Sequence, residues 1–541
     1  MRPTAKSAII LLSFVVSLVS SASQLTCGEV KSLYNEAQCC GSDPSKPANT
    51  TTSFCYPVRD FGYPKCYATF LNISKQYADD TQWAYLPSEE GYSYHPYSGA
   101  ELSDCINIPR AVLHTVPHSS PLGTAILSVE KDPTLPVRLN GQLAISLTGS
   151  WNRANGTETG YQWDVVKLQV DVSTGNVVSS EGSILLNSGP VLYTGQNNSV
   201  AITKKYRPSD IHQAFGRTFA ATKQNKAAAP ADQVFNGVFH MRFENGTAVQ
   251  GESLPLPCAR RLASSAKYLF VSYASCPGLS AWNVSGSGVY AIDPYNLTTV
   301  RMVAGGLHEL DGIDVHGGDL YIATSGQSID NKGNSLLKLP RVDEIADALF
   351  AAPRDDTASN NTSVEVVKTF GYRQSWHAAS ALAITPDGKY ALMSKAAACN
   401  IGCEGVIVAI ELAEPHRVFK YAGGLRNPTG LEIYVSDMYV GLIVADMASD
   451  FGLGTTDLNN GQEGPNDRIL QMALYEPKEE YSVACRDDRH GIVAASSTTC
   501  ATLISDVGCD GKWLWPEFKA FGDFAKLPVA QLCEASCGEC S

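Results

Sequence analysis

Short runs in which apolar and polar residues alternate recur in pairs along the middle of this chain. A β-rich run after a turn signal is followed by a second alternating run that ends at a polar or Pro/Asp/Gly turn, and we count six such pairs. Alternation with a period of two is typical of half-buried strands. The first runs are 142–147, 190–194, 267–272, 319–324, 389–394 and 438–444, and their partners are 165–170, 237–241, 288–293, 335–339, 405–410 and 468–472.

The spacing of these pairs favours a radial arrangement of small sheets. The pairs repeat at roughly 50 to 70 residues, whereas strands of a β-sandwich follow each other at about 8 to 12. Residues 317–319 and 386–388 supply the Gly, Pro and Asp that tight turns need. We therefore predict an all-β fold, a six-bladed β-propeller over residues 109–476, with one helix at 341–350.

Cysteines divide the chain into a middle and two ends. Six of the sixteen cysteines fall before residue 110, six after residue 480, and four between. We predict small disulfide-rich modules at residues 24–108 and 477–541, because modules of this size need covalent staples. In the middle, Cys399 with Cys403 and Cys258 with Cys276 are candidate pairs, while the pairing within the two ends stays open.

The first residues have the features of a secretory signal peptide. Arg2 and Lys6 precede an apolar run over residues 8–19 and the small residues at 21–23. The run is shorter than the roughly 20 residues that cross a bilayer. We expect residues 1–23 to be removed and the protein to be secreted, with no membrane span. Nine N-x-S/T sites agree with a glycoprotein: Asn49, Asn72, Asn155, Asn197, Asn245, Asn283, Asn296, Asn360 and Asn361.

The net charge excludes one class of partner. The chain carries a formal charge of −13 and has a pI near 5.3. Binding of nucleic acid requires clustered Lys and Arg that neutralise phosphates, and no such cluster stands out. We expect small-molecule, glycan or protein partners instead.

Three stretches resemble the glucose/sorbosone dehydrogenase-like quinoproteins, including their pyranose dehydrogenase relatives. They are residues 306–322, residues 377–390 with the Cys399 to Cys403 segment, and residues 422–431, which contain Gly-Leu-Arg-Asn before Pro428. The resemblance implies a six-bladed propeller that oxidises a sugar or sugar-derived alcohol. It also implies pyrroloquinoline quinone (PQQ) as hydride acceptor, with calcium beside it.

The resemblance assigns roles to several positions. His377 matches the family's catalytic base, and a neutral imidazole suits removal of a hydroxyl proton. Arg426 and Asn427 would hold the quinone, whose carboxylates need fixed donors. For calcium we expect ligands within residues 446–467, including Asp450, Gly464 and Pro465.

Two departures from the family leave a second hypothesis open. Residues 378–380 lack the family's arginine, and Lys395 begins a segment where the family has small residues that admit the cofactor. If Lys395 fills the mouth of the central channel, the enzyme hypothesis weakens. The alternative is a non-catalytic extracellular propeller that binds carbohydrate or protein.

The C-terminal cysteines resemble those of the ShK toxin-like (ShKT) module. The chain ends with Cys533, Cys537 and Cys540 in a C-x-x-x-C-x-x-C pattern. Such a module implies binding to an extracellular glycan or protein partner.

Overall fold

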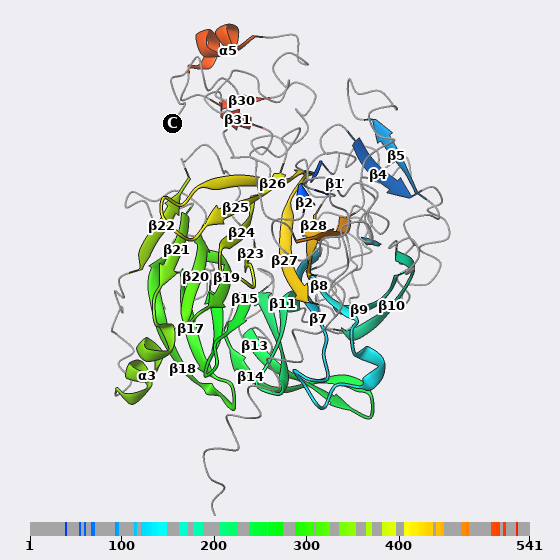
Figure 1. Ribbon diagram of the computed structural model, residues 1–541, viewed down its shortest axis with the longest axis vertical. Helices are drawn as coiled ribbons and strands as arrows, with labels where there is room; N and C mark the ends of the chain where they lie inside the picture. The colour runs from blue at the N-terminus through cyan, green and yellow to red at the C-terminus, as the bar shows by residue number, and fades with distance from the viewer. Residues whose placement is uncertain are drawn as a thin grey trace, which may run out of the picture.

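The computed structural model describes the propeller and short parts of both ends. The described residues are 38–39, 54–55, 59–60, 66–70, 92–96, 113–115, 121–148, 162–170, 177–187, 206–224, 237–256, 258–273, 287–307, 310–324, 335–352, 364–370, 381–395, 405–435, 440–447, 467–474, 499–508, 512–514 and 526–528. Over these residues the protein is built from strands, with few helices (Figure 1). None of the described helices is long and apolar enough to cross a bilayer.

Six sheets with four or five strands make up the described propeller, and each is one blade. In chain order, the strands of blades 1 to 3 are β7 (Pro121–Ile126), β8 (Leu143–Leu147), β9 (Gln162–Val170) and β10 (Val177–Asn187); β11 (Tyr206–Ala214), β12 (Arg217–Gln224), β13 (Gly237–Glu244) and β14 (Thr247–Pro255); and β15 (Ala259–Ser264), β16 (Leu269–Tyr273), β17 (Ser287–Asp293) and β18 (Asn296–Leu307). In each of these three blades consecutive strands pair antiparallel.

Blades 5 and 6 include strands from the N-terminal part of the chain. The strands of blades 4 to 6 are β19 (Leu310–His316), β20 (Asp319–Thr324), β21 (Ser335–Leu339) and β22 (Glu365–Thr369); β23 (Leu382–Ile384), β24 (Tyr390–Lys395), β25 (Gly405–Glu411), β26 (Val418–Leu425) and β3 (Arg59–Asp60); and β27 (Pro428–Val435), β28 (Val440–Asp446), β29 (Asp467–Ala473) and β6 (Leu113–Thr115). Strand β3 pairs parallel with β26, and β6 pairs antiparallel with β29. The ring is therefore closed by a sheet that joins the last propeller strand to a segment preceding the first.

The remaining described elements lie outside the six sheets. They are β1 (Gln38–Cys39) with β2 (Phe54–Cys55), β4 (Cys66–Phe70) with β5 (Tyr92–Pro96), β30 (Lys512–Leu514) with β31 (Lys526–Pro528), the 3-10 helix η3 (Val137–Leu139), and the helices α3 (Val342–Ala351) and α5 (Cys500–Val507). Helix α3 contacts β18 at the periphery of the propeller (Figure 1), and it confirms the helix predicted at 341–350.

The innermost strands β7, β11, β15, β19, β23 and β27 form a closed ring. Each of them contacts the innermost strands of the two neighbouring blades. The all-β, six-bladed prediction is thus confirmed. The strand assignment within the blades needs correction, because five of the six predicted first runs are second strands, and the innermost strands were missed.

The prediction for blade 2 also differs from the structure. The partner of β13 is β12, whereas the sequence pattern paired residues 237–241 with residues 190–194, which lie outside the described residues. The innermost strands were missed because they are short or carry Gly, Pro and charged residues, which weaken the alternating pattern.

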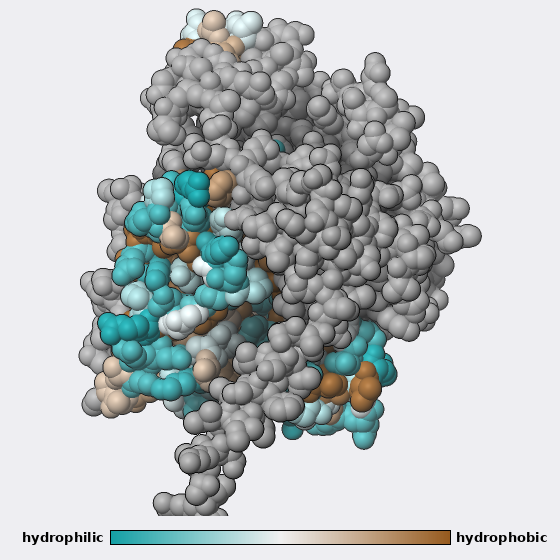
Figure 2. Space-filling view, viewed as in Figure 1, coloured by the Kyte–Doolittle hydropathy of each residue, from teal (hydrophilic) through white to brown (hydrophobic). Residues whose placement is uncertain are grey.

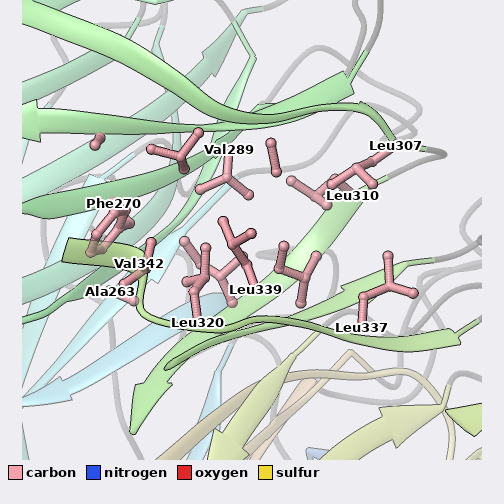
Figure 3. Close-up of a cluster of buried hydrophobic side chains, with 14 of the residues drawn as sticks. Ala263, Phe270, Val289, Leu307, Leu310, Leu320, Leu337, Leu339 and Val342 are labelled. Atoms are coloured by element: carbon pink, nitrogen blue, oxygen red, sulfur yellow. The ribbon is translucent and has the colours of Figure 1, made fainter. Parts of the chain in front are cut away.

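Apolar side chains between neighbouring blades form the core. Figure 3 shows the cluster between blades 3 and 4, where Phe270 and Val289 face Leu310, Leu320 and Leu337. The exposed fraction of each of these five residues is 0 %. Fully burying one side chain of this size stabilises the fold by about 1.5–3 kcal/mol. Packing between blades therefore holds the ring rigid around its axis.

Tight turns set the register of the blades. In the hairpin between β19 and β20, His316 pairs with Asp319, and Gly317 and Gly318 both have positive φ, +62° and +85°. A two-residue turn of this kind matches the twist of the strands and requires residues that tolerate positive φ. The turn predicted here is confirmed.

The outer surface is mostly polar. Figure 2 shows hydrophilic side chains over most of the described face in view, with smaller apolar areas between them. Among the described residues the large hydrophobic side chains that are exposed, Val137, Tyr295 and Val366, come from different blades. Cys258 is disulfide-bonded, while Cys276, Cys399 and Cys403 lie outside the described residues.

Candidate functional site

The predicted cofactor residues lie at one end of blades 5 and 6. Lys395 pairs with Val406, Gly405 with Leu425, and Pro428 with Asp446. The strand register therefore places Lys395, Arg426 and Asn427 at the same end of the propeller. Leu382 pairs with Met393, so the chain also enters β23 from this end. His377, Asp450, Gly464 and Pro465 lie outside the described residues, so their predicted roles stay predictions.

The Gly-Leu-Arg-Asn run holds a buried carboxylate in this fold. The backbone N–H groups of Arg426 and Asn427 donate to Oδ1 of Asp446 over 3.1 and 2.9 Å. The guanidinium of Arg468 donates to Oδ2 of the same carboxylate. Asp446 is fully buried, and Arg426 is only 3 % exposed. The run is therefore an internal cap between blades 5 and 6.

Lys395 lies between blades 4 and 5. Its Nζ is 3.7 Å from the centroid of the Phe370 ring, and the residue is 2 % exposed. Met393, on the same face of β24, belongs to the apolar cluster that includes Phe370 and Val406. Lys395 is not among the residues that line the central cavity. It therefore does not fill that cavity.

The Lys395 ammonium group has an unusual environment. Within the described part of the chain its Nζ has no hydrogen-bond partner. Burial lowers the pKa of this amine to about 7, because a low-dielectric environment disfavours the charged form. Apart from the face of the Phe370 ring, the described residues do not compensate the charge of this amine near neutral pH.

A cavity of about 250 Å³ lies on the propeller axis. All six innermost strands line it, through Gly123, Thr124, Asp210, Ile211, His212, Arg261, Leu262, Gly312, Ile313, Asp314, Leu382, Ala383, Ile384, Gly430, Leu431, Glu432 and Ile433, together with Ala381 and Pro386. Asp314, His212 and Glu432 are half-buried, so solvent reaches the cavity at their level.

Three carboxyl groups enter the cavity from alternate blades. Asp210 is on blade 2, Asp314 on blade 4 and Glu432 on blade 6. Each accepts a hydrogen bond from the innermost strand of the next blade: Leu262 N–H donates to Asp210 and Ile384 N–H to Asp314, both over 2.7 Å, and Ile126 N–H to Glu432. The three carboxyl groups are thus arranged around the axis with approximate three-fold symmetry.

The pKa values of all three carboxyl groups are raised. Burial raises the pKa of Asp210 and of Asp314 to about 6. It raises the pKa of Glu432 to about 8, and the charges of Asp210 and Asp314 add to that effect. Burial also lowers the pKa of His212 to about 4. Since shifted groups that converge in a recess are characteristic of functional sites, the cavity is our candidate site.

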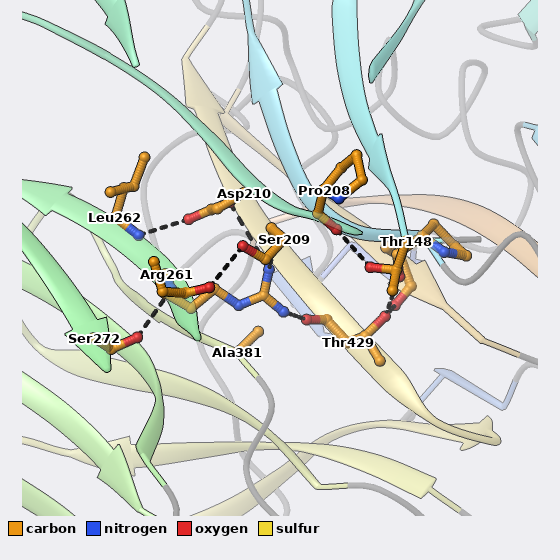
Figure 4. A network of polar contacts seen from close by, with 12 residues as sticks. Thr148, Pro208, Ser209, Asp210, Arg261, Leu262, Ser272, Ala381 and Thr429 are labelled. Atoms are coloured by element: carbon orange, nitrogen blue, oxygen red, sulfur yellow. Dashed lines mark hydrogen bonds and ion pairs between the residues drawn. The ribbon is translucent and has the colours of Figure 1, made fainter. Parts of the chain in front are cut away.

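Arg261 crosses the axis at one side of the cavity. It comes from β15 on blade 3, and its guanidinium donates to the carbonyl of Ser209 over 3.0 Å and to the carbonyl of Thr429 on the opposite blade 6. Figure 4 shows this bridge, with Asp210 beside it and Thr429 on the facing strand. The charge of Arg261 also opposes the raised pKa of Asp210. Arg261 therefore separates the cavity from the end of the propeller that holds Arg426.

Thr124 adds a polar group without a partner. It lines the cavity and is 5 % exposed, and no hydrogen-bond partner of its hydroxyl exists within the described part of the chain. A buried hydroxyl without a partner costs about 1–3 kcal/mol.

Sequence reasoning did not identify these cavity residues. A signal was present, since Gly312-Ile-Asp314 and Gly430-Leu-Glu432 each place a carboxylate between apolar residues of an innermost strand. Both segments lie within stretches that we assigned to another role. For Asp210, His212, Arg261 and Thr124 the sequence gives no comparable pattern.

Nothing in the cavity matches a metal site. Among the described residues no group of three or more His, Cys, Asp or Glu side chains is arranged to hold a metal ion. The positions proposed for calcium are outside these residues. The three carboxyl groups of the cavity are thus not a metal centre by themselves.

Comparisons with known proteins identify no family for this chain. No protein-family model matches the chain, and no curated protein sequence matches it. A solved structure of a luciferin-regenerating enzyme has 9 % identity and a TM-score of 0.36, and the match covers 68 % of this chain and 97 % of that one. A chain of a mitotic checkpoint complex has 12 % identity and a TM-score of 0.29, covering 61 % of this chain and 78 % of that one. Neither similarity bears on function.

Proposed function

We propose that this chain is an extracellular β-propeller that binds a small polar ligand, of about the size of a sugar, in its axial cavity. The observation that carries the proposal is the convergence of Asp210, His212, Asp314 and Glu432 on one cavity. Export is proposed from the signal peptide and the cysteine content of the chain.

Thermal unfolding with a panel of sugars, polyols, amines and carboxylates tests this function. A ligand present at about 100 times its Kd stabilises the folded state by about 2.7 kcal/mol, so at least one compound class is expected to raise Tm clearly. Calorimetric titration then measures the affinity. Failure of every class to shift Tm at millimolar concentration would contradict the proposal.

A second proposed function is oxidation of a sugar or sugar-derived alcohol with PQQ. It is favoured by the register that brings Arg426 and Asn427 to the end of blade 5 where the chain enters β23. PQQ, as a tricarboxylate, needs several cations or free donors. Yet the two backbone amides are committed to Asp446, Arg468 is paired with Asp446, and Lys395 faces Phe370. The described residues at this end do not by themselves fit the cofactor.

Titration with PQQ and calcium decides the second proposal. Quinone absorbance reports binding, and its bleaching by aldoses and alcohols reports oxidation. Saturable binding followed by sugar-dependent bleaching is expected if this function holds, and substitution of His377 would then test the base. Absence of PQQ binding at every calcium concentration would contradict the second proposed function, and ligand binding in the axial cavity would remain as the proposed function.

A further inference from the structure

The axial cavity has an excess of acidic groups. Asp210 lies 3.8 Å from the guanidinium of Arg261. Neither Asp314 nor Glu432 has a described ion-pair partner. The other charged groups that influence these carboxyls are Lys131, in the exposed loop after β7, and His316 on β19. Strand β23 contributes only apolar residues to the lining.

Two carboxyl groups therefore face the cavity without a compensating cation close by. Ionising them in a recess is costly unless an opposite charge approaches. The guanidinium of Arg261 is committed to two carbonyl oxygens and cannot turn toward Asp314 or Glu432 without breaking those bonds. A cation that enters the cavity would supply the compensation that these two carboxyl groups lack there.

The chemistry of the acceptors indicates what carries that charge. Ionised carboxyl groups accept hydrogen bonds, and a primary ammonium group is a compact cation with three N–H donors that can turn toward Asp314 and Glu432. The imidazole of His212, whose Nε2 is 2.9 Å from Oγ of Ser264, offers a neutral polar contact to the rest of the ligand. A bare metal ion is disfavoured, since the described carboxyls do not form a three-ligand group.

We infer that the ligand of the axial cavity is a small hydroxylated primary amine, bound as its ammonium form against Asp314 and Glu432. This inference rests on the proposed binding function and names its ligand class.

Binding of such a ligand is coupled to the loss of protons. The raised pKa values leave the carboxyls partly protonated between about pH 5 and 8, while an aliphatic amine, like lysine, stays protonated there. An ammonium group favours the ionised carboxylates. Affinity is therefore expected to rise with pH across this range, and protons are released on binding.

The test compares glucamine with sorbitol, which differ only in an amine replacing one hydroxyl. Calorimetric titrations at pH 5.5 and 7.5, each in two buffers of different ionisation enthalpy, give affinity and proton release. We expect glucamine to bind at least about tenfold more tightly than sorbitol at pH 7.5, with net proton release. At pH 5.5 the preference is expected to become small, because the carboxyls are protonated.

Glu432→Gln is expected to reduce the preference for glucamine about tenfold and to leave sorbitol binding nearly unchanged. Glu344→Gln, on the exposed start of α3, is the matched control for loss of one negative charge, and Tm confirms that both variants fold. If sorbitol binds as tightly as glucamine at both pH values, binding of a polar ligand stands and the ammonium inference is wrong. If neither compound binds, the inference is also wrong, and the wider solute panel separately decides the binding function.

Discussion

Asp446→Asn is expected to lower the free energy of unfolding by about 3–5 kcal/mol, the cost of breaking a buried ion pair from one side. Asparagine keeps an oxygen for the two backbone amides of Arg426 and Asn427. Its amide nitrogen, however, cannot accept from Arg468, whose side chain is only 3 % exposed. The guanidinium is left charged and buried without its carboxylate.

Denaturant unfolding followed by circular dichroism measures this effect. Asp347→Asn is the matched control, because it breaks an exposed ion pair with Lys267 at 2.6 Å, and exposed pairs contribute at most about 1 kcal/mol. Adding Arg468→Gln to Asp446→Asn is expected to recover part of the lost stability. A loss no larger than that of the control would show that the buried pair contributes little to stability.

Lys395→Met is expected to raise the free energy of unfolding by about 2–4 kcal/mol at pH 7, because it removes a buried, partly charged amine that has no hydrogen-bond partner among the described residues. Methionine keeps a long, flexible side chain against the ring of Phe370. The pKa of the Lys395 amine is lowered to about 7 in the folded protein from the 10.5 of an ordinary lysine. The unfolded chain therefore binds more protons than the folded one between pH 7 and about 10.

The sign of the pH dependence follows from this difference in proton binding. The cost of Lys395 is largest at and below pH 7 and disappears as pH rises toward 10, so the native chain gains stability over this range. The advantage of Lys395→Met is expected to shrink accordingly. Unfolding at pH 7, 8.5 and 10 measures it, with Lys389→Met, on an exposed turn, as control. A stability difference that does not change with pH would contradict the lowered pKa.

The propeller was predictable because its signal is carried by many independent residues. Second and third strands are buried on both faces or alternate regularly, as in Asp319–Thr324 and Gly405–Glu411, so their β-branched and apolar residues stand out. Innermost strands face the axis as well as two neighbouring blades. The glycines of these strands allow side chains of the neighbouring blade to come close. A Cβ atom at Gly123, for example, would lie 2.0 Å from Oδ1 of Asp210.

The axial site was not predictable, because its residues meet only through the closed ring. Arg261 and Thr429 are brought together across the axis by blades 3 and 6, and no local pattern connects them. The Gly-Leu-Arg-Asn run, by contrast, gave a clear motif, and the structure shows its backbone amides engaged in capping Asp446. A motif can thus mark a structural requirement of a fold as readily as a ligand site.

The closure of blade 6 by β6 has a consequence for how the chain folds. Thr115 pairs with Asp467, so the strand that completes the ring is synthesised early and waits for nearly the whole propeller before its partner exists. Contacts between residues so distant in the chain impose a large loop-closure entropy, which slows folding. Once synthesised, β29 presents an open sheet edge until β6 pairs with it, and nascent chains associate with one another on such edges. Efficient folding of this protein therefore depends on protection of the last blade until β6 pairs with β29.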